Sequence, residues 1–325
     1  MILTVTLNTA LDVTYRVPRL EPGASHRVRE VLQRPGGKGL NVARVLAALG
    51  HDVLATGFAG GPAGEILRAL LAAEAAEVTR TAEAGRGGGS LRDALVPIGG
   101  TTRRTVGIVD EAGGDATQFN EPGPQVAPAE WERFLGVYGE LLHDAAPDAV
   151  ALCGSLPPGV PVGAYGTLVR QARAAGVPVL LDTGGEPLRR GLAARPDAVK
   201  PNFPELTDIT GISEPLDAAR LVRRRGAHAV VASLGADGLL ALTPEGVWRV
   251  EPPRRLTGNP TGAGDSVVAA LLSGLVEGLS WPDRLARATA LSAATVRAAA
   301  AGEFDRAVYE ELLPKVTVTR QTAAT

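Results

Sequence analysis

The segment 258–266, GNPTGAGDS in one-letter code, stands directly before the apolar run 267–272. Its glycines permit backbone conformations and close approaches that a Cβ would block. The N–H groups of Gly262, Ala263 and Gly264 can therefore converge on one anion. The positive end of the following helix adds to the attraction. The segment predicts a phosphate-handling site at the start of a helix.

Asp265 lies in the same turn, where its charge would repel a bound phosphate. A carboxylate at this position has a chemical use if it takes the proton from an attacking hydroxyl group. We therefore predict that Asp265 is the catalytic base. The alternative is an ordinary acidic residue at a helix start, where Asp is common.

The segment 258–266 resembles the carboxy-terminal signature of the PfkB, or ribokinase-like, carbohydrate kinases. The segment 34–46, RPGGKGLNVARVL, resembles their amino-terminal signature. Residues 6–8, followed by Asp12, are similar to the opening strand of the hexose-phosphate branch, which includes 1-phosphofructokinase, tagatose-6-phosphate kinase and the minor 6-phosphofructokinase. The resemblance runs from about residue 2 to about residue 300. Two signatures in the expected order are more specific than either alone.

The amino-terminal signature predicts the sugar side of the site. Gly36 and Gly37 let the backbone come close to a substrate, and Lys38 and Asn41 are three residues apart near the start of a predicted helix. Sugar hydroxyl groups need acceptors, which Asp12 and Asn41 supply, and the matching residues of the family hold the sugar. For Asp12, the alternative is a turn cap.

A sugar that already carries a phosphate needs a second anion site, away from the candidate base. Lys38, Arg27 and Arg103 are the candidates, and the resemblance aligns both arginines roughly with phosphate-contacting residues of the hexose-phosphate branch. Either arginine is alternatively a solvated surface residue, because the chain is rich in arginine. Ser155 is similar to the substrate-side serine turn of the family, and its alternative is a plain turn residue.

The nucleotide side is predicted where a strand ends near Lys200. Asn202 and Glu205 match the Asn-x-x-Glu element of the family, which orients magnesium through water. Mg²⁺ retains several waters, so an amide and a carboxylate acting through water are sufficient. A helix capping box is the alternative for this pair. By the resemblance, Lys200 reaches a phosphate of ATP.

The segment 233–238 follows a buried strand and resembles the nucleotide-binding turn of the family, which assigns Ser233, Gly235 and Gly238 to the nucleotide. The segment 182–186 departs from the common family pattern because it carries a Gly at position 184.

Short runs rich in Val, Ile and Leu alternate with helical patterns along the chain. Strands are predicted at 2–7, 148–152, 177–181, 198–199 and 229–232, and helices at 40–49, 128–144, 162–175, 215–225, 265–277 and 282–301. This alternation predicts an α/β protein with a mainly parallel sheet and helices on both faces. Ligands of such sheets bind beyond the carboxyl ends of the strands. The resemblance implies the ribokinase-like three-layer fold.

Two turn-rich segments, 13–33 and 95–120, lack helical patterns, and in the family such segments form a small β lid over the sugar. Residues 1–319 are expected to form a single kinase domain. We expect a flexible glycine-rich insertion at about 76–91 and a frayed tail at 320–325.

Composition excludes several classes of protein. The 325 residues are 45% apolar and carry a net charge of −2, which gives no electrostatic footprint for nucleic acid or an anionic membrane. Neither a membrane span nor a charged signal-peptide head is apparent, so we expect a cytoplasmic protein. The histidines lack metal-ligand spacing, and no dinucleotide-binding or P-loop pattern occurs. Exposed lid edges favour a homodimer.

Together these patterns predict an ATP-dependent, magnesium-requiring kinase that converts fructose 1-phosphate to fructose 1,6-bisphosphate. Tagatose 6-phosphate and fructose 6-phosphate are alternative acceptors, because the variant sequence at 259–261 does not decide between them. A non-catalytic sugar-phosphate-sensing protein is the alternative from another class, but it would have no reason to keep Asp265 beside the glycine turn.

Overall fold

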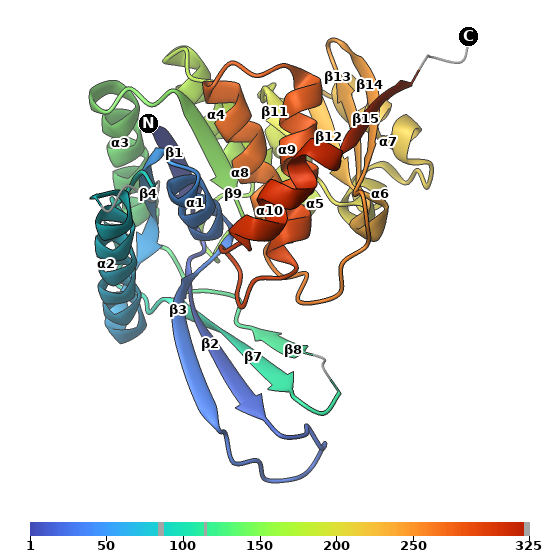
Figure 1. Cartoon of the computed structure of the whole chain (residues 1–325). Helices are drawn as coiled ribbons and strands as arrows, with labels where there is room; N and C mark the ends of the chain where they lie inside the picture. Colours follow the sequence, from blue (N-terminus) through green and yellow to red (C-terminus); the bar gives the residue numbers. More distant parts are fainter. Residues whose placement is uncertain (84–87, 114–115, 322–325) are drawn as a thin grey trace.

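A central sheet of eleven strands organises the chain in a computed structural model that describes residues 1–83, 88–113 and 116–321 (Figure 1). The strands are β1 (Ile2–Thr6), β4 (Asp52–Ala59), β5 (Ser90–Asp93), β6 (Val96–Pro97), β9 (Ala149–Cys153), β10 (Val179–Asp182), β11 (Ala198–Val199), β12 (Ala229–Ser233), β13 (Leu239–Thr243), β14 (Gly246–Glu251) and β15 (Thr317–Gln321). Their order is β15-β14-β13-β12-β11-β10-β9-β1-β4-β5, with β6 beside β4. The pairs from β5 to β12 are parallel, and those from β12 to β15 are antiparallel.

Helices cover both faces of the sheet, and a separate apolar core fills each interface (Figure 1). One face carries α1 (Lys38–Ala48), α2 (Gly61–Glu83), α8 (Ala263–Val276), α9 (Trp281–Thr295) and α10 (Arg306–Leu312). The other face carries α3 (Pro128–Asp144), α4 (Ala164–Ala174), α5 (Gly185–Leu192), α6 (Phe203–Thr210) and α7 (Pro215–Arg224). The predicted three-layer α/β fold is therefore confirmed. Strands covered on both faces read as continuous apolar runs, which is why the sequence revealed several of them.

Two helices bring the signature segments to the carboxyl ends of the central strands. In α1, Val42, Val45 and Leu46 are fully buried against the sheet. The helix α8 begins after Gly262, whose φ of 86° is in the left-handed region. Its residues from Asp265 to Gly274 are buried. Both helix starts consequently lie at the edge of the sheet where ligands of parallel α/β proteins bind.

A second sheet of four strands projects from the body as a lid (Figure 1). It contains β2 (Ala10–Val17), β3 (Glu30–Gly36), β7 (Arg103–Asp110) and β8 (Ala116–Asn120), in the order β3-β2-β7-β8. The predicted lid is confirmed, but its second segment starts later than the expected residue 95. Residues Val96 and Pro97 form β6 and pair with β4, because the apolar Val96 is buried in the body.

Three expected boundaries differ from the structure. Residues 76–83 of the expected insertion continue α2, where Val78 packs on the core. At the other end of the expected insertion, Ser90 begins β5. Residues 84–87 lie outside the described residues. The expected tail begins too early, because Arg320 and Gln321 pair with β14, and residues 322–325 lie outside the described residues. The predicted helix 282–301 ends at Thr295.

Among the described residues, no helix combines the length and the apolar character that a membrane span requires.

Candidate active site

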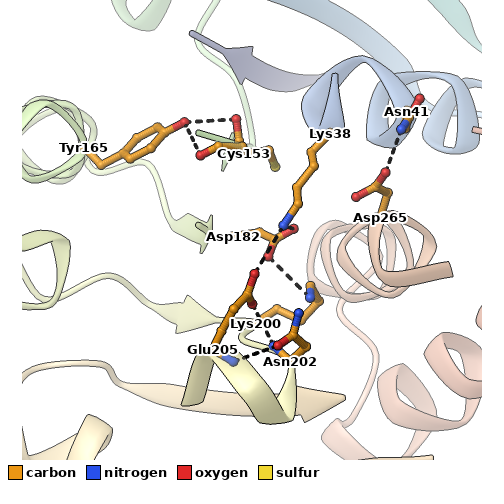
Figure 2. A network of polar contacts seen from close by, with 10 residues as sticks. Lys38, Asn41, Cys153, Tyr165, Asp182, Lys200, Asn202, Glu205 and Asp265 are labelled. Carbon is orange, nitrogen blue, oxygen red and sulfur yellow. Dashed lines mark hydrogen bonds and ion pairs between the residues drawn. The ribbon is translucent and has the colours of Figure 1, made fainter. Parts of the chain in front are cut away.

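Asp265 occupies the first turn of α8 and is only 6% exposed. Its Oδ2 atom accepts a hydrogen bond from Nδ2 of Asn41 over 2.7 Å, which joins the two signature segments (Figure 2). Burial and, after it, the charge of Asp182 raise the pKa of Asp265 to about 6. A carboxylate with this pKa is ionised at neutral pH and still accepts a proton readily, as a general base requires.

Asp182 lies at the centre of the site and was not among the predicted site residues. It is the last residue of β10 and is fully buried. Lys38 Nζ lies 3.5 Å from its Oδ2 atom, and Lys200 Nζ lies 3.3 Å from its Oδ1 atom (Figure 2). One carboxylate thus anchors two lysines. The available signal was an acidic residue at the end of a buried strand, immediately before the 182–186 turn.

The two lysines differ in their access to solvent. Lys38 is 38% exposed, and its Nζ also lies 3.7 Å from Oε1 of Glu205. Burial alone would lower the pKa of Lys38, but the carboxylates of Asp182, Glu205 and Asp265 raise it above its ordinary value. Lys200 is 3% exposed, and its Nζ is 3.5 Å from the point that a Cβ on Gly264 would occupy. Lys200 therefore lies between Asp182 and the glycine turn.

The glycine turn limits which N–H groups of the predicted anion site are available, while the part of the Gly262 N–H group stays a prediction. A Cβ on Gly262 would lie 2.9 Å from the Cα atom of Ala301, so this position requires glycine on steric grounds as well as for its positive φ. The N–H group of Ala263 donates to the carbonyl oxygen of Pro260 over 3.1 Å and is engaged. At a helix start the following N–H groups, here those of Gly264 and Asp265, have no acceptor within the helix. These two groups are better placed than Ala263 to hold an anion.

A cavity of about 590 Å³ lies beside Lys38 at the carboxyl ends of the strands. Its lining includes Thr6, Asn8, Gly37, Lys38, Arg103, Asn120, Gly154, Ser155, Leu156, Thr183, Gly184, Pro187 and Glu205. The structure thus brings Lys38, Arg103 and Ser155 together. Arg27 is exposed in the connection between β2 and β3 and does not line this cavity, so its part in an anion site stays a prediction.

Side-chain hydrogen bonds fix the shape of this cavity. Asn8 Nδ2 donates to Oγ of Ser155 over 3.1 Å, while its Oδ1 atom is buried without a hydrogen-bond partner in the described structure. The hydroxyl of Tyr165 lies 3.0 Å from the carbonyl oxygens of Cys153 and Gly154 and holds the turn that carries Ser155 (Figure 2). Asn8 is a second site residue that sequence reasoning left unassigned, although it lies in the quoted opening strand.

Asp12 lies on β2, next to the glycines of the amino-terminal signature. A Cβ on Gly36 would lie 2.1 Å from Cγ of Asp12, so the carboxylate rests where a side chain would otherwise stand. Burial raises the pKa of Asp12. Asp12 lines a separate pocket of about 120 Å³ between the lid and residues 299–301, together with Arg34 and Arg44. Gly36 and Asp12 therefore belong to the lid strands and do not line the 590 Å³ cavity, and their contact with the sugar stays a prediction.

A second cavity of about 870 Å³ extends to Gly264, next to Lys200. Of the predicted nucleotide residues, Asn202, Ser233, Gly235 and Gly238 line it, whereas Lys200 does not. Its walls otherwise include Leu234, Leu239, Leu256, Val267, Thr289, Ala293 and Val296, and it extends to Ala263 and Gly264. An apolar cavity that ends at a glycine turn suits a flat base joined to a phosphate chain.

Asn202 and Glu205 form the helix cap that was the alternative interpretation. Asn202 Oδ1 accepts from the N–H group of Glu205, and Glu205 Oε2 accepts from that of Asn202, each over 2.8 Å. The cap leaves Oε1 of Glu205 facing Lys38. Asn202 lines the 870 Å³ cavity and Glu205 lines the 590 Å³ cavity, so the cap lies at the boundary between these two cavities.

The donor chemistry at this boundary fits magnesium held through water. The oxygens of Asp182 accept no hydrogen bond in the described structure, and Oε1 of Glu205 faces the same space. Hard oxygen donors of this kind suit Mg²⁺ that keeps most of its waters. Among the described residues, no cluster of three or more His, Cys, Asp or Glu side chains could hold a metal ion directly. Asp182 and Glu205 are accordingly the residues that would hold its waters. The predicted part of Asn202 stays a prediction, because its Oδ1 atom already accepts from the N–H group of Glu205.

Comparison with known proteins agrees with this geometry. The model of the pfkB family of carbohydrate kinases matches residues 3–86 and 91–306. The structure is similar to phosphofructokinase-2 from Escherichia coli, with a TM-score of 0.85 and 29% identity over 97% of this chain and 98% of that chain. A possible 1-phosphofructokinase from Thermotoga maritima is similar with a TM-score of 0.86 and 28% identity, over 99% of this chain and 100% of that chain. Arabidopsis thaliana ribokinase, solved with ribose and ATP, has a TM-score of 0.69 and 22% identity over 96% of this chain and 98% of that chain. This likeness supports the fold alone.

The chain belongs to the pfkB family of carbohydrate kinases. It is a phosphotransferase with an alcohol group as acceptor, in the phosphofructokinase branch. The Escherichia coli relative has been solved with fructose 6-phosphate and also in a tetrameric inhibited form.

Proposed function

We propose that this kinase phosphorylates a ketohexose that already carries a phosphate, with ATP as the donor and fructose 1-phosphate as the preferred acceptor. The observation that carries the proposal is the pair of cations, Lys38 and Arg103, in one cavity beside the buried carboxylate network. An uncharged sugar needs no such pair, whereas each charge-assisted contact to a phosphate contributes roughly 1.5–3 kcal/mol. Tagatose 6-phosphate and fructose 6-phosphate are the alternatives, and the second is supported by the ligand of the Escherichia coli relative.

The proposed reaction uses Asp265 as its base. Asp265 takes the proton of the acceptor hydroxyl group while that oxygen forms a bond to the γ-phosphorus. The bond between the γ-phosphorus and the β–γ bridging oxygen breaks, and ADP leaves with the electron pair. The N–H groups of Gly264 and Asp265 and the ammonium of Lys200 stabilise the charge on the transferred group. Catalysis of this kind rests on positioning and electrostatics.

The nucleotide is proposed to lie in the larger cavity, with its base among the apolar walls and its phosphates toward Gly264. Bound magnesium would neutralise part of the phosphate charge. Asp182 and Glu205 would hold its waters, and Lys38, which faces both carboxylates, lines the acceptor cavity.

A homodimer through the lid is also proposed. The edge strands of the lid are β3 and β8, which expose Val31 (54%) and Phe119 (58%). Apolar side chains on unpaired edges favour pairing with a second copy. Light scattering after gel filtration tests this, and a monomer at micromolar concentration would contradict it.

A coupled assay of ADP release across a panel of acceptors tests the function. Fructose 1-phosphate, fructose 6-phosphate and tagatose 6-phosphate are compared with fructose and ribose at equal concentrations. We expect a phosphorylated ketohexose to give the highest kcat/KM, by about 100-fold or more if two charge-assisted contacts are lost with the phosphate. The opposite ranking, with ribose or free fructose first, would refute the hexose-phosphate proposal.

The Asp265→Asn variant separates an enzyme from a sensor. Its turnover should fall by roughly 10² or more, whereas binding of the sugar phosphate, measured by calorimetry, should persist. A wild-type protein that binds the sugar phosphate but releases no ADP with any acceptor would favour the sensing protein instead.

A further inference from the structure

Arg44 is an arginine of α1 that is 8% exposed and is linked to the candidate base, Asp265, through Asn41. Nothing in the proposed chemistry uses it. Buried arginines are rare unless their charge is paired, because an unpaired buried charge is costly. The Nε atom of Arg44 is buried without a hydrogen-bond partner in the described structure, so its two terminal nitrogens make its contacts. The contacts of this guanidinium therefore indicate what it holds in place.

The two terminal nitrogens of Arg44 bond four acceptors from different parts of the chain. One nitrogen donates to the carbonyl oxygen of Pro35 and to Oε2 of Glu74 over 3.3 Å. The other donates to Oδ1 of Asn41 and to the carbonyl oxygen of Ala301 over 3.2 Å. These contacts tie the Gly36–Gly37 turn, α2 and the segment after α9 to one planar group.

The contact with Asn41 has a chemical consequence. An amide side chain has one oxygen and one NH₂ group, and its two orientations are otherwise similar in shape. The guanidinium of Arg44 has only donors, so the amide oxygen of Asn41 must face it. The NH₂ group of Asn41 must then face Asp265, whose Oδ2 it reaches over 2.7 Å.

We propose that Arg44 is a positioning residue for phosphoryl transfer: by holding the amide oxygen of Asn41, it keeps the Asn41 NH₂ group donating to the carboxylate of the base, Asp265. The inference rests on the proposed role of Asp265. It gives Arg44 the task of fixing the protonation behaviour of the base, a task that needs no contact between Arg44 and the substrate.

The expected sign follows from the hydrogen bond. Donation from Asn41 stabilises the ionised carboxylate and lowers the pKa of Asp265, against the stronger raising effect of burial. If Arg44 no longer holds the amide, Asn41 can turn its oxygen toward the carboxylate, and the ionised form loses its donor. The pKa of Asp265 then rises above about 6, so that the base becomes active only at higher pH.

Other groups around Asp265 affect the same titration and must stay unchanged in the test. The titratable and charged groups near it are Lys38 of α1, Cys153 of β9, Asp182 of β10, and Lys200 after β11. Glu205 of α6 is one step further out, through Lys38. From α9, the nearby contact is the uncharged hydroxyl of Thr295 with Ser266.

The test is the pH dependence of the single-turnover rate of ADP formation in Arg44→Lys, with fructose 1-phosphate, or the best acceptor of the panel. Lysine keeps the charge but cannot present two nitrogens to four acceptors. We expect the acid limb of the profile to move upward by about one pH unit, with a smaller change in the KM of the sugar. Glu74→Gln is the matched control, because it removes the negative charge that faces Arg44 but keeps an amide oxygen that can accept from it and leaves Asn41 held, and its profile should be that of the wild type.

A double-mutant cycle identifies the route of the effect. In an Asn41→Ala background, Arg44→Lys should produce no further shift of the acid limb, because the residue through which Arg44 acts is absent. If the shifts add, or if Arg44→Lys changes only the sugar KM through nearby Asp12, the inference is overturned. Melting temperatures of all variants show whether each protein is folded, and Arg44→Gln replaces a lysine variant that does not fold.

Failure of this inference is distinguishable from failure of the proposed function. If Asp265→Asn retains wild-type turnover, the base assignment itself is wrong, whatever Arg44 does. If Asp265→Asn is inactive while Arg44→Lys has the wild-type profile, only the positioning role of Arg44 is refuted.

Discussion

Lys200 Nζ lies 3.3 Å from Oδ1 of Asp182, and the two side chains are 3% and 0% exposed. Buried ions of opposite charge persist only when each compensates the other. The second oxygen of Asp182 faces Lys38 from the opposite side. A phosphate group that enters the site must therefore compete with Asp182 for both lysines, so this carboxylate sets how strongly they bind phosphate.

Asp182→Asn tests that arrangement. The change removes the charge that both lysines face and also a charge that raises the pKa of Asp265. We expect turnover to fall at least tenfold, the acid limb of the pH profile to move to lower pH, and unfolding to become easier by about 3–5 kcal/mol, as for a broken buried pair. Denaturant titration and the pH profile measure these effects. Asp208→Asn, a change of an exposed residue on α6, is the control. A wild-type pH profile in Asp182→Asn would contradict the role of Asp182 as the shared partner of both lysines.

Asp265→Asn should stabilise the protein at neutral pH. The pKa of Asp265 is about 6 in the folded state and 3.8 ordinarily. Because the folded-state pKa is raised, the contribution of Asp265 to stability is fully present below about pH 4 and is lost as the pH rises through 6. The loss amounts to about 3 kcal/mol, at about 1.4 kcal/mol per unit, and asparagine avoids it. We expect the variant to exceed wild type in unfolding free energy at pH 8 but not at pH 4. Equal differences at both values would show that Asp265 is not destabilised by ionisation.

Glu205→Gln distinguishes the metal role from the cap. Glutamine also serves in a capping box, so a purely structural Glu205 would make the change nearly silent. If Glu205 orients waters of magnesium, turnover should fall and the half-activating magnesium concentration should rise, without a change in sugar preference. Glu130→Gln is a control, because Glu130 likewise accepts from the N–H group of its N-cap residue, Ala127, at the start of α3. A magnesium titration with wild-type midpoint and turnover would assign Glu205 to the cap alone.

Arg103→Met tests the acceptor phosphate site. Arg103 lines the cavity of Lys38, and its Nε donates to the carbonyl oxygen of Asn8 over 3.3 Å. We expect the KM of the phosphorylated sugar to rise roughly 10–100-fold, the value of one charge-assisted contact, with a much smaller effect on the KM of ATP. Arg104→Met is the control, since Arg104 pairs with Glu121 and does not line the cavity. Equal effects of the two changes would argue against a specific role.

The sequence predicted the elements whose patterns are local. The strands near 149–153 and 229–233, the helix Pro128–Asp144, and the turns that begin α1 and α8 follow from apolar runs, periodicity and glycine. It did not predict β13 to β15, which are held by pairing with each other, nor the helix α2, part of which falls in the expected insertion. Those outcomes depend on tertiary neighbours that a local pattern does not contain.

The candidate site shows the same division. The signatures identified Asp265, Lys38 and Asn41, but the importance of Asp182 depends on two lysines that approach it from other elements. The position of Arg27 outside the cavity depends on the path of the β2–β3 connection. Spacing along the chain thus indicated which residue types do chemistry, whereas their shared partners became visible only in three dimensions.

The interior place of β1 in the main sheet, between β9 and β4, has a consequence for biosynthesis. This first strand pairs with β4 on one side and with β9 on the other, so its second partner is not synthesised until residues 149–153. The hydrogen bond between Asn41 and Asp265 spans 224 residues. Native contacts of such separation form late, after the entropy of closing long loops has been overcome. A ribosome-bound chain that stops before β9 therefore presents an apolar strand with one free edge, and this nascent protein depends on chaperones or rapid elongation until β9 arrives.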